Sequence, residues 1–399
     1  MKDFVPPSAD AGEPLDGPAD EQHLEPAEAP PPLDYEIALE LDAGAGLTQR
    51  IGRRQWPLPK GADPDAPLLV VENLTTEFAL EKTTVHAVDG VSFTLRDGEA
   101  LGIAGESGCG KTTTALSLVR LLPKNARIAA GSVRMYGVDL IPKSDDALRR
   151  YRWREISIVF QGAMNALNPV VKIGDQIAEP MQERLQLSES ESRKRARDLL
   201  ERVGIPRKRA NAYPHELSGG MRQRAMIAMA LACDPAVVIG DEPTTALDVM
   251  VQAQVLQLLE DLREELGLSL ILITHDLSVI AETCDRVLVM YAGRVAEEGP
   301  VREIFARPRH PYTQMLLGAF PNIHADRRTL GTIPGSPPDL RDPPSGCRFH
   351  PRCPLVMDVC RTERPPEATV GDGVRVACHL YAAGTAEDPV AVPPAEAIA

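Results

Sequence analysis

"GESGCGKTTT", residues 105 to 114, contains the pattern Gly-x-x-x-x-Gly-Lys-Thr, which is typical of a loop around nucleotide phosphates. It follows EALGIA, which reads as a short buried strand, and leads into KTTTALSLVRLL, which has helical spacing. Gly105 and Gly110 allow the backbone to turn its N–H groups inward toward phosphate oxygens. Lys111 is expected to reach the β- and γ-phosphates, and Thr112 to offer its hydroxyl to Mg²⁺. Strand, glycine loop and helix together predict a nucleoside triphosphate site.

Composition divides the 399 residues, whose net charge is −14, into unequal parts. The first 66 residues hold 14 Asp and Glu, 5 Lys and Arg, and 11 of the 36 prolines. Such a segment buries too little apolar surface to offset its ordering entropy, so we expect 1–66 and the Ala- and Pro-rich tail 383–399 to be disordered. We find no signal peptide and no unbroken apolar run of about 18 residues, and therefore expect no membrane-spanning helix. The mildly acidic remainder gives no indication of nucleic-acid binding.

The sequence between these segments predicts an α/β fold. AVVIGDEP (236–243) and LSLILITHD (268–276) are too apolar for alternation, as expected of strands in a parallel sheet covered on both faces. LLVVENLTTEFAL (68–80) and VHAVDGVSFTLRDG (85–98) read as strands joined by a polar turn, and predict an antiparallel β subdomain.

Helical patterns fill much of the rest. Residues from about 162 to 232 are expected to form a mostly helical subdomain within a nucleotide core that spans 67–320. The segment 249–267 places five apolar residues on one helical stripe: Val251, Val255, Leu258, Leu259 and Leu262.

A carboxylate pair ends the apolar strand in VVIGDEP. Asp241 is suited to hold Mg²⁺ through water, and Glu242 is placed to polarise an attacking water. Strands often end in acidic residues, so the position of this pair behind the phosphate loop is what strengthens the interpretation.

The stretch ELSGGMRQRAMIAMALACDP, residues 216–235, adds a second candidate anion site. Ser218, Gly219 and Gly220 begin a long helix whose free N–H groups and dipole favour an anion. The chain's own phosphates are already assigned to residues 105–112, so this helix start needs another ligand or a second copy of the protein. Here the sequence resembles the ATP-binding-cassette (ABC) ATPases, in which two cassettes pair head to tail and each signature closes on the other's ATP.

The resemblance covers about residues 68–320, with six motifs in the family's order and Met221 where Gln is commoner. It implies a P-loop NTPase fold of ABC-ATPase type. The implied ATP-binding residues are Phe78, Gly105, Glu106, Ser107, Gly108, Cys109, Gly110, Lys111, Thr112, Thr113, Gln161 and Asp241. The implied Mg²⁺ ligands are Thr112, Gln161 and Asp241, and the implied catalytic residues are Glu242, His275 and Gln161. The residues implied to contact the partner's ATP are Ser218, Gly219, Gly220 and Asp248.

A narrower resemblance comes from GAMNALNP and from RPRHPYTQMLL, residues 307–317. Both are similar to the ATPase subunits of oligopeptide and dipeptide importers, which are related to nickel importers. His310, Pro311 and Tyr312 would begin the C-terminal extension of that branch, predicted here over 321–382. Taken alone, the same three residues would more often be a turn with an aromatic side chain packed on the core.

Four cysteines in the extension, Cys347, Cys353, Cys360 and Cys378, follow the spacing C-x5-C-x6-C-x17-C. The segment is rich in proline and poor in apolar residues, so four thiolates around a metal would supply free energy that burial does not. Zinc sites usually contain close cysteine pairs, whereas looser spacing suits an iron–sulfur cluster. The resemblance implies a structural [4Fe–4S] cluster; zinc, free thiols and disulfides stay open.

The resemblance implies an ATPase subunit at the cytoplasmic face of a membrane, bound there to two permease subunits and served by an extracytoplasmic solute-binding protein. It would drive uptake of di- or oligopeptides, or alternatively of nickel or another small solute. A second, different cassette is expected as its partner, ahead of a homodimer. A soluble ABC ATPase of ribosomes or DNA is the other class, but such proteins carry two cassettes or long insertions that we do not find.

Overall fold

The computed structural model describes residues 58–59, 61–81, 83–162, 166–245, 247–319, 333–371, 373–382 and 390–392. The predicted disorder of 1–66 and 383–399 falls largely outside these residues and stays a prediction. All of the described residues belong to one unit, residues 51–399. None of the helices in these ranges combines the length and hydropathy needed to cross a membrane.

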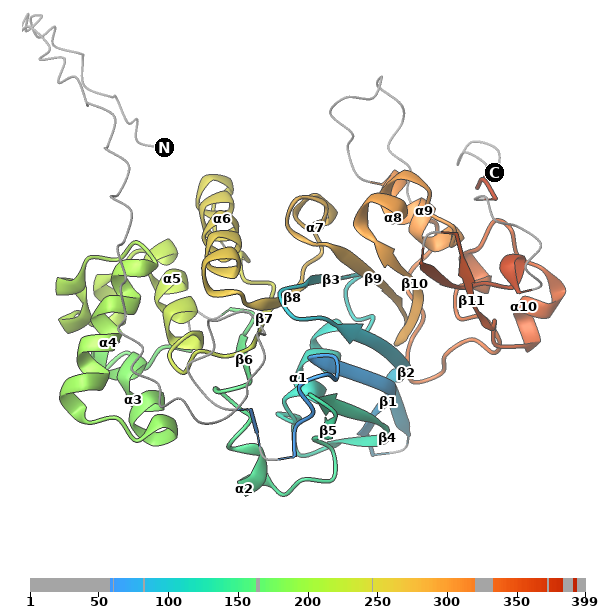
Figure 1. Ribbon diagram of the computed structural model, residues 1–399. Coiled ribbons are helices and arrows are strands. Elements are labelled where there is room, and N and C mark those ends of the chain that lie inside the picture. Colours follow the sequence, from blue (N-terminus) through green and yellow to red (C-terminus); the bar gives the residue numbers. More distant parts are fainter. Residues whose placement is uncertain are drawn as a thin grey trace, which may run out of the picture. The chain divides into compact units, whose positions relative to one another are not determined.

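An eight-stranded sheet runs through the fold in the order β11-β12-β10-β9-β3-β8-β7-β6 (Figure 1). Its strands are β3 (Ala100–Ala104), β6 (Ile156–Val159), β7 (Val237–Asp241), β8 (Ser269–Ile273), β9 (Arg286–Tyr291), β10 (Arg294–Pro300), β11 (Glu367–Val370) and β12 (Val374–Ala377). The five strands from β6 to β9 pair in parallel, and β10, β12 and β11 continue the sheet antiparallel. Every residue of β3, β7 and β8 is buried, which confirms the predicted parallel strands.

A second sheet is antiparallel, in the order β2-β1-β4-β5. Its strands are β1 (Leu69–Ala79), β2 (Thr84–Leu95), β4 (Ala126–Met135) and β5 (Val138–Asp139). This sheet, helix α1 (Lys111–Leu118) and the main sheet share one core, which includes Phe93, Leu118, Ile239 and Met290. The glycine loop between β3 and α1 is therefore positioned by two elements that are both anchored in the core.

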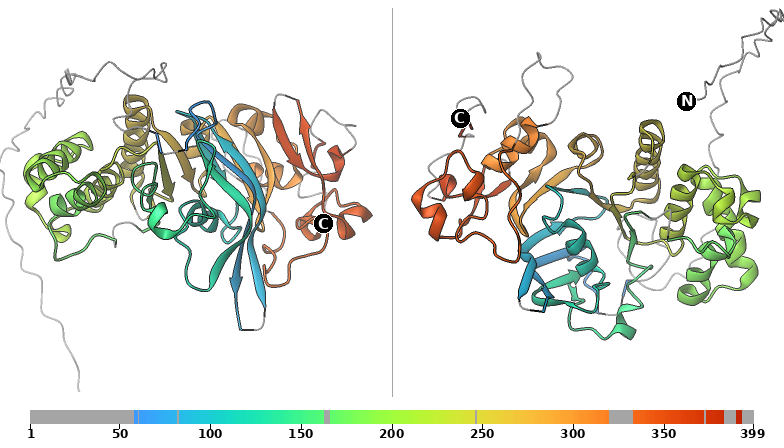
Figure 2. Two further views of the ribbon diagram at one scale, coloured as in Figure 1. Left: turned by 60° about the horizontal axis from the view of Figure 1, so that its bottom comes forward. Right: turned by 180° about the vertical axis from the view of Figure 1, so that it is seen from behind.

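Three helices pack together beside the β6 end of the main sheet (Figures 1 and 2). They are α3 (Ile173–Leu185), α4 (Glu189–Arg202) and α5 (Gly219–Ala230), with the 3₁₀ segments η2 (Arg207–Asn211) and η3 (Pro214–Glu216) between the last two. A capping box begins α4, where the Ser188 hydroxyl accepts from the Glu191 N–H and the Glu191 carboxylate accepts from the Ser188 N–H. These helices lie within the helical subdomain predicted over about 162–232, whose bounds stay a prediction.

Helix α6 (Val249–Leu266) carries the apolar stripe that the sequence predicts. Val255, Leu259 and Leu262 are buried, and Val251 and Leu258 pack partly buried against the same core. The shorter helices are α2 (Asp145–Leu148), α7 (Leu277–Thr283), α8 (Val301–Ala306), α9 (Pro311–Gly318) and α10 (Asp358–Thr362). Two 3₁₀ segments, η4 (His350–Arg352) and η5 (His379–Tyr381), complete the extension.

The extension buries more apolar surface than its composition predicts. The hairpin β11–β12 adds to β10 at the edge of the main sheet, so β12 has a strand partner on both sides. Phe349, Val374, Val376 and Tyr381 are all at most 2% exposed within the main core. The expectation that burial alone could hardly hold this segment folded was therefore wrong. The segment has no separate core: it pairs with the cassette's sheet and packs its apolar side chains into the cassette's core.

Candidate active site

The glycine loop after β3 has the backbone geometry of a phosphate cradle. Gly105 has a φ of 145° and Gly110 a φ of 107°, which L side chains rarely adopt. A Cβ at Gly105 would lie 2.2 Å from the carbonyl oxygen of Met290, and one at Gly110 would lie 2.3 Å from that of Ala87. Both positions require glycine, because the loop lies directly against the backbones of β9 and β2.

Lys111 is directed back into this loop. Its Nζ donates to the carbonyl oxygens of Gly105 at 2.7 Å and Glu106 at 3.0 Å, and its side chain is buried. Gly110 is the N-cap of α1 and makes no side-chain capping bond to the first turn. The N–H groups at this helix start, the helix dipole and the ammonium group together favour an anion such as a triphosphate.

Thr112 and Asp241 meet at the end of β7. The Thr112 hydroxyl donates to Asp241 Oδ1 at 3.2 Å. Burial raises the pKa of Asp241, the bond from Thr112 works against this rise, and the charge of Glu242 adds to it. Hydroxyl and carboxylate oxygens are the hard donors that Mg²⁺ prefers, so the residues present fit this ion.

Three side chains surround the Glu242 carboxylate. Gln161 Nε2 donates to Oε2 at 2.7 Å, and the Thr245 hydroxyl donates to the same oxygen at 2.9 Å. His275 Nδ1 lies 3.5 Å from Oε1. The structure thus brings together the three residues predicted to be catalytic. It adds Thr245, which the sequence analysis missed although a hydroxyl three residues after the carboxylate was the available signal.

Phe78, the predicted adenine contact, lies near the end of β1. It is half-buried, opposite Val85 on β2 and Ala126 on β4. The stacking role of this ring stays a prediction.

The predicted signature residues begin helix α5. Ser218 is the N-cap, and its hydroxyl accepts from the Met221 N–H at 3.3 Å. Gly219 and Gly220 form the first turn. Within the described residues these bonds stay inside α5 and do not join the network around Glu242.

Asp248 begins α6 in the same manner, with Oδ1 accepting from the Val251 N–H at 3.0 Å. The next two side chains, Val249 and Met250, are 79% and 72% exposed. Large apolar side chains so exposed at a helix start form a surface that another protein could cover.

Comparison with known proteins decides the family. Two family profiles match, ABC transporter over residues 88–245 and oligopeptide/dipeptide transporter, C-terminal region, over residues 296–360. A probable peptide ABC transporter ATP-binding protein of Sinorhizobium fredii is 48% identical over 322 residues, covering 79% of this chain and 96% of that relative. The chain belongs to the ABC transporter ATP-binding proteins. A putative peptide import ATP-binding protein of Brucella abortus is 49% identical over 308 residues, covering 77% of this chain and 93% of the relative.

Solved structures of ABC cassettes share the fold. The dimeric cassette MJ0796, in a post-hydrolysis state bound to ADP and Pi, has a TM-score of 0.54 and 30% identity, covering 59% of this chain and 99% of its own. The structure of cbiO1 from Clostridium perfringens, part of the ABC transporter complex cbiONQ, has a TM-score of 0.53 and 31% identity, covering 60% of this chain and 91% of its own. The predicted α/β fold of ABC-ATPase type is confirmed, and this ABC protein is an ATPase.

The His-Pro-Tyr segment of this ABC protein begins α9. His310 is the N-cap, and its Nδ1 accepts from the Tyr312 N–H at 3.0 Å. The Tyr312 ring is fully buried, with its centroid 4.6 Å from that of Tyr291 and 5.4 Å from that of Phe349. The expectation of an aromatic packed on the core is confirmed together with membership of the branch.

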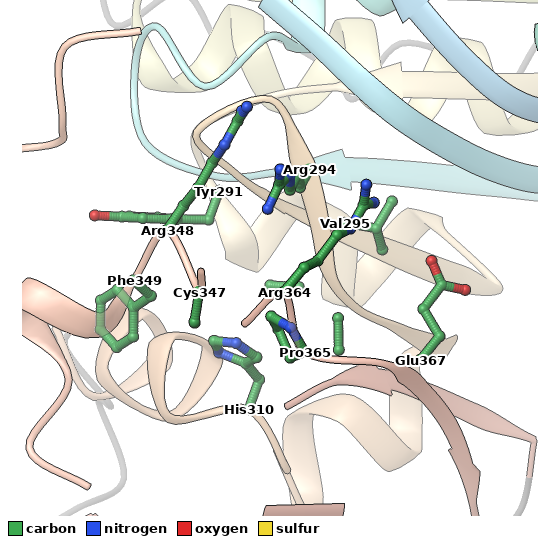
Figure 3. A pocket seen from close by; sticks show the side chains of 12 residues that line it. Tyr291, Arg294, Val295, His310, Cys347, Arg348, Phe349, Arg364, Pro365 and Glu367 are labelled. Atoms are coloured by element: carbon green, nitrogen blue, oxygen red, sulfur yellow. The ribbon is translucent and has the colours of Figure 1, made fainter. Parts of the chain in front are cut away.

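A cavity of about 40 Å³ lies at this joint between β9, β10 and the extension. Figure 3 shows Tyr291, His310, Cys347 and Phe349 around it. It has room for a few water molecules at most, so it is a gap in packing rather than part of the nucleotide site.

The four predicted ligand cysteines of the ABC protein are free thiols, and their charges interact with one another. Burial, together with the charges of the other three, raises the pKa of Cys378 to about 12, and burial raises that of Cys353 to about 12. No group of three or more His, Cys, Asp or Glu side chains in the described ranges is arranged to hold a metal ion. The predicted zinc or iron–sulfur site is therefore not supported by this arrangement.

Two residues of the region matched by the oligopeptide/dipeptide transporter profile, residues 296–360, contact the glycine loop, and the sequence analysis missed this role for both. Tyr312 and Arg352 each bond to Glu106. The only sequence signal for these residues is that they lie in the His-Pro-Tyr segment and the cysteine-rich segment. Neither segment predicts a contact with the glycine loop.

Proposed function

We propose that this ABC ATPase powers the import of di- or oligopeptides. The observation that carries the proposal is the match of residues 296–360 to the oligopeptide/dipeptide transporter C-terminal region, joined to a complete set of ATPase residues. The Sinorhizobium fredii relative is named a peptide ABC transporter ATP-binding protein and the Brucella abortus relative a peptide import ATP-binding protein, and both names support the same substrate class.

In the proposed mechanism the glycine loop and Lys111 bind the triphosphate, while Thr112 and Asp241 would hold Mg²⁺, which would neutralise charge on the phosphates. Glu242 accepts a proton from water as the water oxygen bonds to the γ-phosphorus and the bond to the β–γ bridging oxygen breaks, which gives ADP and phosphate. Gln161 and His275 fix the carboxylate of Glu242 for this transfer.

The second cassette is proposed to complete each site. Ser218 and Asp248 would approach the nucleotide of the partner, since their own bonds are confined to the helices that they begin. Val249 and Met250, exposed beside Asp248, would be covered in the same interface. A different ABC ATPase is our first choice of partner, and a second copy of this chain the next.

The assembled transporter would place this chain at the cytoplasmic face of the membrane, held there by two permease subunits. An extracytoplasmic binding protein would deliver the solute. No nucleic-acid partner is proposed.

The test is purification of the tagged full chain from its native membrane in mild detergent, followed by identification of the bound proteins. We expect two permeases and a second ABC ATPase, and ATP hydrolysis that rises when the binding protein is added with peptide. Stimulation by a nickel chelate but not by peptide would give the alternative solute, and recovery of ribosomal proteins without permeases would overturn import.

We further propose that the four cysteines bind a structural [4Fe–4S] cluster rather than zinc. Backbone N–H groups of Phe349, Leu355 and Leu380 bond to the sulfurs of the cysteines two positions before them. Such bonds stabilise thiolates, and the four free thiols, two of them buried (Cys360, Cys378) and two partly buried (Cys347, Cys353), supply the donor chemistry of a cluster.

Anaerobic purification of the full chain tests this proposal. We expect about four iron and four labile sulfide per chain and loss of both in Cys360→Ser, while Cys284→Ser, which alters a buried cysteine outside the group, keeps them. One equivalent of zinc without iron would decide for zinc, and no metal under these conditions would leave the thiols free.

A further inference from the structure

The C-terminal extension holds Glu106, the second residue of the glycine loop, at two points. Arg352 donates through Nη1 to Glu106 Oε2 at 2.6 Å and through Nη2 to Oε1 at 3.0 Å. The backbone N–H of Glu106 donates to the Tyr312 hydroxyl at 2.9 Å. The side chain and the main chain of this loop residue are therefore both bound by residues of the matched C-terminal region, residues 296–360.

Arg352 is itself fixed by its surroundings. Its side chain is 6% exposed, its Nε donates to the carbonyl oxygen of Pro334 at 2.7 Å, and its Nη1 also donates to the Tyr291 hydroxyl at 3.2 Å. A guanidinium fork bound at several points loses little further freedom when it pairs with a carboxylate, so the contact with Glu106 is a firm one.

The restraint on Glu106 reaches the lysine of the phosphate site. The carbonyl oxygen of Glu106 accepts from Lys111 Nζ at 3.0 Å, next to the bond from Lys111 to Gly105. A displacement of Glu106 would therefore move one of the two carbonyl groups that orient the ammonium.

Charge gives the contact a second effect. A triphosphate is strongly anionic, and an unpaired carboxylate beside its site would repel it. Arg352 compensates the charge of Glu106, so the same ion pair positions the loop and removes this repulsion.

We propose that Arg352 and Tyr312 are positioning residues for ATP: through Glu106 they hold the glycine loop in the shape that receives the triphosphate. A loop ordered in advance pays no ordering entropy on binding, so the extension raises ATP affinity without touching the nucleotide. The inference rests on ATP binding by the family and is independent of the solute transported.

The test compares MgATP dissociation constants of the purified full chain and its variants. Arg352→Met and Tyr312→Phe are expected to raise the dissociation constant about tenfold, and Arg352→Lys by less, because lysine keeps the charge but not the fork. In the assembled transporter the KM for ATP should rise by the same factor while kcat stays within about twofold. Tyr312→Phe removes a single oxygen, so it serves if Arg352→Met does not fold.

Arg348→Met is the matched control. Arg348 belongs to the same extension and is also 6% exposed, but it pairs with Asp89 on β2. Its loss should lower the unfolding temperature and leave the dissociation constant within about twofold. Equal weakening by Arg348→Met, or unchanged ATP affinity in folded Arg352→Met and Tyr312→Phe, would overturn the proposal. Failure of the wild-type chain to bind MgATP would instead contradict the nucleotide site.

A double-mutant cycle separates this role from general destabilisation. In a Glu106→Gln background, Arg352→Met should change the dissociation constant by about threefold or less, because the ion pair is already lost. Additive effects of the two substitutions would show that Arg352 does not act through Glu106.

Discussion

The side-chain amide of Gln161 donates a hydrogen bond of 2.7 Å to the carboxylate of Glu242. The two residues follow β6 and β7, which are adjacent parallel strands, so the carboxyl ends of these strands bring them together. Thr245 donates to the same oxygen. The protein's own side chains thus orient this carboxylate at the edge of the sheet where the phosphate loop begins its helix.

Glu242→Gln should lower ATP turnover by about 10²–10⁴-fold, because an amide cannot accept the proton of the attacking water. ATP affinity should change little, since the carboxylate is not among the groups assigned to phosphate or Mg²⁺. Phosphate release and equilibrium nucleotide binding measure the two effects, with the exposed Glu282→Gln as the control. Turnover at the wild-type rate in Glu242→Gln would remove the proposed general base.

Lys111→Ala should weaken MgATP binding by at least about tenfold, because the site loses a charge-assisted donor to phosphate. The same change leaves the carbonyl groups of Gly105 and Glu106 without a donor that they have in the folded protein. Calorimetric titration of the folded variant gives the affinity, and an unchanged value would refute the assignment of the cradle.

Met250→Asp should impair ATP-dependent pairing of cassettes, because it buries a charge in an apolar contact. In a Glu242→Gln background, which retains ATP, we expect about tenfold weaker association measured by sedimentation. Val170→Asp is the control, since Val170 is 78% exposed and lies on the chain before α3. Equal association of the two variants would place the cassette interface elsewhere.

His310 should make the protein sensitive to acid. Burial lowers its pKa to about 4, so the folded protein keeps the ring neutral where an unfolded chain, with a pKa near 6.5, takes up a proton. The contribution of His310 to stability is complete above about pH 6.5 and falls as the pH drops toward 4, by roughly 2–3 kcal/mol at about pH 4.5. His310→Asn, which can still cap α9, should reduce this fall in denaturant titrations.

Other charged groups near His310 act in both proteins. Glu297 accepts from the N–H groups of Arg309 and His310, and burial raises its pKa, so its titration changes stability in the opposite direction. The difference between wild type and His310→Asn isolates the imidazole. Parallel stability curves from about pH 7 to pH 4.5 would show that the ring is protonated in the folded protein.

Local sequence predicted most of the cassette because its determinants are local. The glycine loop, the apolar strands that end at Asp241 and Ile273, and the stripe of α6 each depend on residues within one or two elements. Parallel strand order then brings the ends of β3, β6, β7 and β8 to one edge, which gathers the predicted catalytic residues. The family resemblance supplied their roles.

The structure of the extension was predicted less well from the sequence, because it depends on contacts between segments that are far apart in the chain. The pairing of β12 with β10 places Arg375 opposite Glu298. The composition of the two strands does not predict this pairing. The pair Glu106 and Arg352 likewise has no periodic or local signature. Short proline-rich segments that add to an existing sheet keep few apolar residues of their own, so their burial is underestimated from sequence.

The 246 positions that separate Glu106 from Arg352 also set an order of events during protein synthesis. At roughly 5–20 residues per second, a ribosome needs about 12–50 s to add them. During this time the glycine loop has been synthesised but lacks its contact with Arg352. A nascent chain, or one cut short by an early stop codon, would carry a loosely held cradle. The chain would reach its full affinity for ATP only when translation is nearly finished. ATP consumption would therefore be delayed until the polypeptide is ready for assembly.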